Sequence, residues 1–144
     1  MRESNCYDQK ADLNDVANLW LDTNLKAHNF ISAEYWNTNF EFVKEMLPQA
    51  EVYVYENDKK IQGFIGLNGE YIEGIFVAAE MQSRGIGKLL LDYAKDRKSK
   101  LLLKVYQKNT RAVCFYQREG FEIQSEGVDD DTGEKDYAMI WQQK

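Results

Sequence analysis

Apolar residues in the first third of the chain recur every three or four positions, which is the spacing of the buried face of a helix. The pattern breaks at residues 28–32, so two helices are expected. Asp12 can cap the first helix, Ser32 can cap the second, and Pro48 ends the second. The expected buried positions are Leu13, Val16, Ala17, Trp20, Trp36, Phe40, Val43 and Leu47.

After residue 50 the apolar period changes to two, which is typical of β-strands. The Asn68-Gly69 pair is a strong signal for a tight hairpin turn. Residues 1–7 are a weaker strand candidate. A meander of three strands is therefore expected at residues 52–55, 61–67 and 71–77.

Helices and strands alternate in the second half of the chain. One helix is expected from about residue 86 to Lys98, and a short one over residues 110–119, closed by Gly120 just after its last turn. The apolar strand at 101–106 follows a helix, so it is expected to run parallel to the last strand of the meander.

The chain ends in two expected strands, at 121–123 and 137–141, with a long acidic loop at 125–136 between them. The 144 residues are 44% hydrophobic and 13% aromatic, which is enough for a sizeable core. No repeat or linker divides them. We expect one α/β domain that spans residues 1–144.

Composition and charge exclude several classes of protein. No run of about 18 apolar residues could cross a membrane, and the polar start lacks the apolar core of a signal peptide. Cys6 and Cys114 have neither metal nor redox spacing, which favours a reduced, cytoplasmic protein. The net charge of −6 argues against a nucleic-acid partner and mildly favours cationic partners.

A turn with two glycines, residues 82–87, lies between a strand and a helix. The first N–H groups of a helix have no partner within it, its dipole makes that end positive, and glycine lets a ligand approach the backbone. The turn can therefore hold a phosphate, or it is an ordinary connection. It is neither a Walker A loop, because Gln82 and Leu89 stand where a glycine and a hydroxyl are needed, nor a Rossmann turn, because Leu90 replaces the third glycine.

Two motifs resemble those of the GNAT N-acetyltransferase superfamily. Residues 82–87 match its coenzyme-A motif Q-x-x-G-x-G, and residues 109–121 match its signature N-x-x-A-x-x-F-Y-x-x-x-G-F. The order of strands and helices agrees over nearly the whole chain. The chain is identified as a GNAT member, and residues 28–35 and 103–109 resemble a small bacterial branch that includes peptidyl-lysine acetyltransferases.

This resemblance implies a mixed sheet of about six to seven strands with about four helices, and acetyl-CoA as cosubstrate without a metal. It places the pantetheine chain along the backbone of Phe76 and Val77, where the two central strands splay apart. Arg84 and Lys88 are the expected phosphate cations, and Asn109 either holds pantetheine or caps the short helix. The expected cofactor-binding residues are Phe76, Val77, Gln82, Ser83, Arg84, Gly85, Ile86, Gly87, Lys88, Asn109 and Tyr116.

Acetyl transfer needs an acid for the leaving thiolate and a base for the amine, because a lysine has a pKa of about 10.4 in water. The family places its tyrosine acid at the position of Tyr116, whose phenol is a donor at neutral pH. Alternatively, Tyr116 has only a structural role, as a buried aromatic residue that packs against Phe121.

The expected base is Glu73, a carboxylate in an otherwise apolar strand whose pKa burial would raise. Residues 71, 73, 75 and 77 are expected to share one face of that strand. Many family members carry the glutamate two residues earlier, where this chain has Tyr71. A water relay, a merely structural Glu73, and His28 as base or acceptor-binding residue stay open. The expected acceptor side comprises His28, Tyr71 and Glu73.

These expectations combine into an N-acetyltransferase that moves an acetyl group from acetyl-CoA to a primary amine by direct attack in a ternary complex. The expected acceptor is a protein lysine, drawn by the acidic rim at 125–136. A small cationic amine is the alternative acceptor. A non-catalytic acyl-CoA-binding regulator is the rival of another class, and the net charge disfavours a tRNA-acetylating toxin. Either a monomer or a homodimer fits the sequence.

Overall fold

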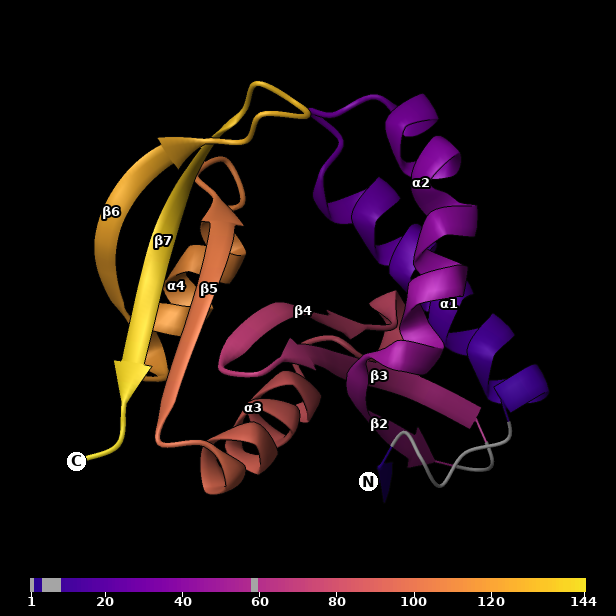
Figure 1. The fold of residues 1–144 in the computed structure, drawn as a ribbon, viewed down its shortest axis with the longest axis horizontal. Helices are drawn as coiled ribbons and strands as arrows, with labels where there is room; N and C mark the ends of the chain where they lie inside the picture. The colour runs from indigo at the N-terminus through magenta and orange to yellow at the C-terminus, as the bar shows by residue number, and fades with distance from the viewer. Residues whose placement is uncertain (1, 4–8, 58–59) are drawn as a thin grey trace.

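The central sheet is mixed, and helices cover both of its faces (Figure 1). The computed structural model describes residues 2–3, 9–57 and 60–144. Within these residues the strand order is β1-β2-β3-β4-β5-β7-β6. The strands are β1 (Arg2–Glu3), β2 (Glu51–Asn57), β3 (Lys60–Asn68), β4 (Tyr71–Val77), β5 (Lys100–Tyr106), β6 (Glu122–Val128) and β7 (Lys135–Gln142). The helices are α1 (Gln9–Ala27), α2 (Ala33–Met46), α3 (Ile86–Arg97) and α4 (Thr110–Arg118), with 3-10 turns η2 (Leu47–Gln49) and η3 (Ala79–Met81).

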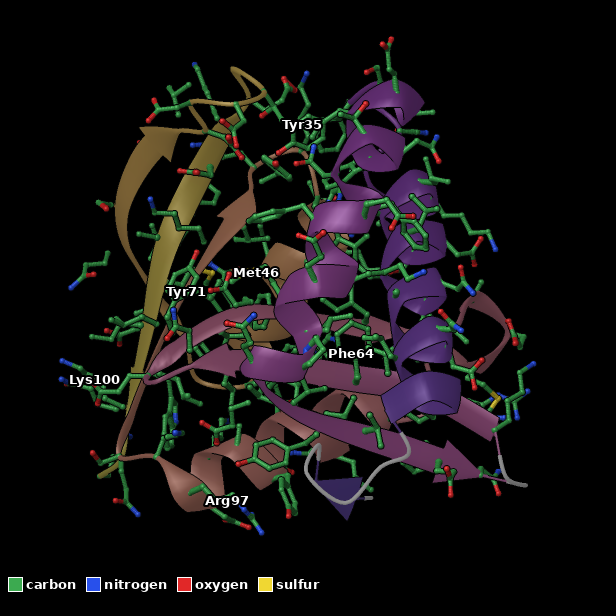
Figure 2. All side chains as sticks on the ribbon, turned by 45° about the vertical axis from the view of Figure 1, so that its right-hand side comes forward. Tyr35, Met46, Phe64, Tyr71, Arg97 and Lys100 are labelled. Atoms are coloured by element: carbon green, nitrogen blue, oxygen red, sulfur yellow. The ribbon has the colours of Figure 1, made fainter. Side chains whose placement is uncertain are left out.

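Each face of the sheet has its own apolar cluster. On one face, Leu90 and Leu91 of α3 pack with Leu101 of β5, and all three are fully buried. On the other face, Val16 of α1 packs with Phe64 of β3, which Figure 2 shows between the sheet and helices α1 and α2. Each such side chain contributes about 1.5–3 kcal/mol on burial. Both helix layers are thereby fixed to the sheet.

The parallel strands β4 and β5 separate after a short paired segment, as Figure 1 shows. Only Tyr71 and Ile72 of β4 pair with β5, opposite Leu102 and Leu103. Beyond Ile72, no strand in the described part of the chain pairs with the edge of β4 that faces β5. The expected parallel pairing and the expected splay are both confirmed, and the splay leaves an opening in the middle of the sheet.

A bulge in β4 overturns the expectation that residues 71, 73, 75 and 77 share one face. Gly66 of β3 pairs with Gly74, and the next residue of β3 pairs with Ile72, so Glu73 is an extra residue in the ladder. Ile72 therefore packs in the same cluster as Ile75, although three positions separate them. An inserted residue shifts the alternation by one, which the apolar pattern alone does not reveal.

The prediction of a long acidic loop at 125–136 is also wrong. Strand β6 continues to Val128 and β7 begins at Lys135, so only residues 129–134 connect them. Every residue of β6 is exposed, which lets its charged side chains stay in water while its backbone pairs with β7. A strand exposed on both faces carries no apolar alternation to mark it.

The helical boundaries follow the sequence closely. Helix α1 begins at Gln9, before the expected cap Asp12, because residues 9–11 are themselves good helix formers. Ser32 caps α2 as expected, and its Oγ accepts a hydrogen bond from the backbone N–H of Tyr35. The expected strand at residues 1–7 is seen at residues 2–3, and the rest of it, with Cys6, lies outside the described residues. None of the helices in the described ranges is long and apolar enough to span a membrane.

Candidate active site

Two clefts of opposite charge meet at the splay between β4 and β5. The acidic cleft, about 620 Å³, carries five carboxylates and one cation among the described residues that line it: Glu73, Asp129, Asp130, Asp131, Asp136 and Lys104. The basic cleft, about 860 Å³, carries five cations and one carboxylate among its described lining: Lys26, Lys88, Lys108, Arg111, Arg118 and Glu119. Both clefts are lined by Ile75, Asn109, Ala112 and Tyr116.

The glycine-rich turn forms the floor of the basic cleft. Gly85 caps α3 with a φ of 83°, in the left-handed region that glycine adopts freely, and its carbonyl accepts the N–H of Leu89 at 3.0 Å. A Cβ at Gly85 would meet no atom within 4 Å, so the space above the turn is open. Residues 85–88 line the basic cleft, so the start of α3, where N–H groups lack partners within the helix, lies at this cleft, as in an anion site.

Arg111 braces this turn from the neighbouring helix. Its guanidinium donates to Gln82 Oε1 at 2.7 Å and to Ser83 Oγ at 2.8 Å. Gln82 in turn donates from Nε2 to the carbonyl oxygen of Val77 at 3.0 Å. The end of β4, the turn and the first turn of α4 are thus joined by three hydrogen bonds, and a fixed positive charge lies beside the anion site.

Tyr116 lies on α4 between the two clefts. Its side chain is 7% exposed, and its ring makes edge contacts with Phe115 and Phe121 at centroid distances of 5.3 and 5.5 Å. Burial and, to a smaller extent, the nearby Tyr71 raise the pKa of Tyr116 above its usual value. The phenol therefore stays protonated at neutral pH and can donate into the junction of the clefts.

Glu73 projects from the bulge of β4 into the acidic cleft. Its side chain is exposed to the cleft, and partial desolvation there raises the pKa of its carboxyl group. No hydrogen bond or ion pair joins this carboxylate to another described residue. Tyr71 lines the same cleft and lies at the end of β4 that is paired with β5, opposite Leu102. Burial, with the charge of Glu73, raises the pKa of Tyr71.

His28 is a packed, neutral residue at the wall of the acidic cleft. Burial lowers its pKa to about 4. Both ring nitrogens are engaged: Nδ1 lies 2.9 Å from Asn24 Oδ1, and Nε2 lies 3.0 Å from Asn109 Nδ2. The ring has no free nitrogen to take a proton from a substrate.

Comparison with known proteins assigns the family. Residues 48–123 match the model of the acetyltransferase (GNAT) domain. The chain is 37% identical over 135 residues to the peptidyl-lysine N-acetyltransferase YiaC of Escherichia coli, which covers 92% of each chain. It is 32% identical to the peptidyl-lysine N-acetyltransferase YjaB of Salmonella typhimurium, over 85% of this chain and 84% of that one. The protein is a GNAT acetyltransferase.

Solved structures show the same fold. The solution structure of apo-form YjaB from Escherichia coli has a TM-score of 0.84 at 24% identity, over 99% of this chain and 97% of that one. The structure of the PaiA N-acetyltransferase from Thermoplasma acidophilum in complex with coenzyme A has a TM-score of 0.75 at 20% identity, over 91% of this chain and 92% of that one. The expected fold class and the expected acetyl-CoA-dependent N-acetyltransferase are confirmed.

The cofactor-binding residues expected for this GNAT domain divide between the clefts. The basic cleft is lined by Val77, Gln82, Ser83, Gly85, Ile86, Gly87 and Lys88, with Asn109 and Tyr116 at the junction. Phe76 instead lines the acidic cleft and stacks on Phe64. Arg84 lines neither cleft. Lys88 is paired with Asp92 at 3.2 Å and Glu119 at 3.1 Å, and these partners raise its pKa.

One residue of the clefts escaped the sequence analysis, and a second was expected on a loop instead of a strand. Arg111 is one helical residue among several cations, and only its place in the first turn of α4, beside the splay, marks it. Asp136 on β7 is 6% exposed and lines the acidic cleft, and neither a hydrogen bond nor an ion pair joins its carboxylate to another described residue. The sequence analysis placed it on the acidic rim at 125–136, but expected a loop where β7 begins.

Proposed function

We propose that this protein acetylates lysine side chains of other proteins, with Tyr116 as the general acid and Glu73, directly or through water, as the general base. The main observation behind the proposal is that a basic cleft and an acidic cleft meet at Tyr116, which lines both. The basic cleft is complementary to the phosphates of acetyl-CoA, and the acidic cleft to a cationic amine. The relatives named peptidyl-lysine N-acetyltransferase support a protein lysine as acceptor.

The residues at the junction supply the steps of the transfer. Glu73 receives the proton that the ammonium must lose, and its raised pKa makes it a better proton acceptor. The neutral amine nitrogen then forms a bond to the thioester carbon, and the carbon–sulfur bond breaks. Tyr116 donates its phenolic proton to the leaving sulfur, so coenzyme A departs as a thiol, and the phenolate regains a proton when the acylated nitrogen loses its second one.

The backbone of β4 would orient the thioester. Its edge beyond Ile72 pairs with no strand of the described residues, so amides there can pair with the pantetheine amides as an added strand would. The start of α3, Arg111 and the turn at 82–87 would hold the phosphates. Tyr116 and Asn109 line both clefts and would therefore meet both substrates.

The test incubates the protein with acetyl-CoA and lysine-containing peptides and counts acetyl-lysines by mass spectrometry. We expect new acetyl-lysines, and a loss of turnover of about 10²- to 10⁴-fold in Tyr116→Phe, because the phenolic proton is absent. Phenylalanine keeps the edge contacts with Phe115 and Phe121, so calorimetry should find acetyl-CoA binding retained.

Tyr55→Phe is the matched control, because Tyr55 lies outside both clefts and should keep full turnover. Spermidine is the second acceptor. If spermidine is acetylated and the peptides are not, the acceptor is a small amine and not a protein lysine. Binding of acetyl-CoA with neither product would identify a non-catalytic acyl-CoA-binding protein. Full turnover in Tyr116→Phe would remove Tyr116 from the chemistry.

A further inference from the structure

A continuous chain of hydrogen bonds connects α4 to α1 through His28. The backbone N–H of Ala112 donates to Asn109 Oδ1 at 3.2 Å, and this bond caps α4. Asn109 Nδ2 lies 3.0 Å from His28 Nε2, and His28 Nδ1 lies 2.9 Å from Asn24 Oδ1. Asn24 Nδ2 donates to the carbonyl oxygen of Trp20 at 2.9 Å.

The contacts at the two ends of this chain determine every donor and acceptor within it. Asn109 uses Oδ1 for the helix cap, so its Nδ2, which can only donate, must give a hydrogen to His28 Nε2. Asn24 uses Nδ2 for the Trp20 carbonyl, so its Oδ1 must accept from His28 Nδ1–H. The imidazole is therefore neutral, with its hydrogen on Nδ1.

Aromatic side chains hold the imidazole ring in place. It stacks on Trp36 at a centroid distance of 5.7 Å and makes edge contacts with Tyr106 at 5.0 Å and Phe30 at 5.7 Å. These rings come from α2, from β5 and from the segment between the first two helices. A ring fixed by packing from several elements can fix the orientation of the amide that it binds.

We propose that His28 is a positioning residue that orients the Asn109 amide, and with it the first turn of α4, at the junction of the two clefts. Asn109 lines both clefts, and with one amide hydrogen on His28 it keeps one for a ligand. Arg111, which braces the turn at 82–87, belongs to the same first turn of α4. The acceptor side of the molecule thereby sets the geometry of the acetyl-CoA side.

The proposal rests on the proposed function only for its effect on turnover, so the test begins with acetyl-CoA binding. His28→Phe keeps a ring between Trp36 and Tyr106 and removes both hydrogen bonds. We expect the Kd of acetyl-CoA to rise about tenfold, because Asn109 then loses the acceptor that orients it. In an Asn109→Ala background the same His28→Phe change should have almost no further effect, because the group on which His28 acts is gone.

Phe30→Leu is the matched control for this cycle, because it alters the packing around the imidazole without removing a hydrogen bond. Its effect on the Kd should be the same in both backgrounds. Equal effects of His28→Phe with and without Asn109 would overturn the proposal, and so would an unchanged Kd.

The second readout is the side-chain amide signal of Asn109 in NMR spectra of the unliganded protein. It should shift in His28→Phe and return towards its native position in His28→Gln, whose amide offers both an acceptor and a donor. If His28→Phe fails to fold, His28→Leu, which also lacks a hydrogen-bond acceptor, carries the test, and an Asn109 signal that stays at its native position in that variant overturns the proposal. Turnover is measured last. If the effects of His28→Phe and Asn109→Ala on the Kd are coupled but no acceptor is acetylated, the proposed function is contradicted and the positioning role of His28 is still supported.

Discussion

The two clefts differ in charge and in how the chain builds them. The basic cleft takes most of its lining from two short segments, residues 75–88 and 108–119. The acidic cleft draws on α1, α2, β4, β5 and the β6–β7 turn, which span residues 20–136. The cofactor side is thus a local structure made by motifs, whereas the acceptor side is a product of the whole fold. This difference explains why a family can keep one cosubstrate while its acceptors vary.

The opposite charges also separate the two substrates. In the proposed function acetyl-CoA is anionic and the acceptor lysine is cationic, so each would be attracted to one cleft and repelled by the other. The described residues that line both clefts carry no charge at neutral pH, because they are an isoleucine, an asparagine, an alanine and a protonated tyrosine. Under the proposed function, charge therefore sorts the substrates, and neutral groups at the junction would act on the reacting atoms.

The largest remaining effect is expected from Glu73→Gln, which removes the proposed base from the acidic cleft. Turnover should fall about 100-fold, because the amine no longer has a carboxylate to receive its proton. In the native protein kcat/KM should fall as the pH drops through the raised pKa of Glu73, since only the ionised form accepts a proton. Initial rates across a pH series measure both effects.

The stability of Glu73→Gln supplies a check with the opposite sign. Because the pKa of Glu73 is raised on folding, its charge costs stability above that pKa, and the cost is relieved as the pH falls through it. The variant should therefore be no less stable at neutral pH. Glu70→Gln, in the β3–β4 turn outside both clefts, is the control. If kcat/KM still falls at low pH in Glu73→Gln, the general base is water or another group.

The sequence predicted the basic cleft more completely than the acidic cleft. The turn at 82–87 and the motif at 109–121 were readable because their residues are neighbours in the chain. Glu73 was found as a carboxylate in an apolar strand, although the bulge that directs it into the cleft left no mark in the alternation. Asp136 was expected on the acidic rim, but on a loop instead of strand β7, because β6 is exposed on both faces and carries no apolar alternation. The contacts of the acceptor side join residues that lie far apart in sequence.

Arg111→Ala tests whether the basic cleft can be weakened alone. The change removes the hydrogen bonds to Gln82 Oε1 and Ser83 Oγ and takes a cation from the anion site. Bonds from a charged group contribute about 1.5–3 kcal/mol, so the KM of acetyl-CoA should rise at least about tenfold. The KM of the acceptor peptide should not change, because Arg111 does not line the acidic cleft.

The matched control is Arg84→Ala, which removes the same charge from a residue that lines neither cleft. Steady-state kinetics with each substrate varied in turn compares the two variants. If Arg84→Ala raises the KM of acetyl-CoA more than Arg111→Ala does, then Arg84 contacts the phosphates, as the sequence predicts. An acceptor KM that rises with Arg111→Ala would show that the clefts are coupled through α4.

The smallest effect is expected from Asp136→Asn, which probes the acidic cleft alone. The residue is only 6% exposed, and no hydrogen bond or ion pair joins its carboxylate to another described residue, so its charge is poorly solvated and costs stability. Asparagine has nearly the same shape without the charge. The melting temperature should therefore rise, while the KM of the acceptor peptide increases about fivefold, the equivalent of an ion pair of about 1 kcal/mol. Thermal denaturation and kinetics measure the two changes on one sample.

Opposite signs for stability and acceptor affinity are the signature of a charge kept for a ligand. A structural carboxylate would give a lower melting temperature, and that result would contradict the assignment of Asp136 to the acceptor. Asp130→Asn is the control, because it removes the same charge from an exposed position at the rim of the same cleft. Its solvated carboxylate should alter neither the melting temperature nor the KM by as much. Comparable effects from both variants would mean that the cleft attracts lysine through its total charge, with no particular role for the buried aspartate.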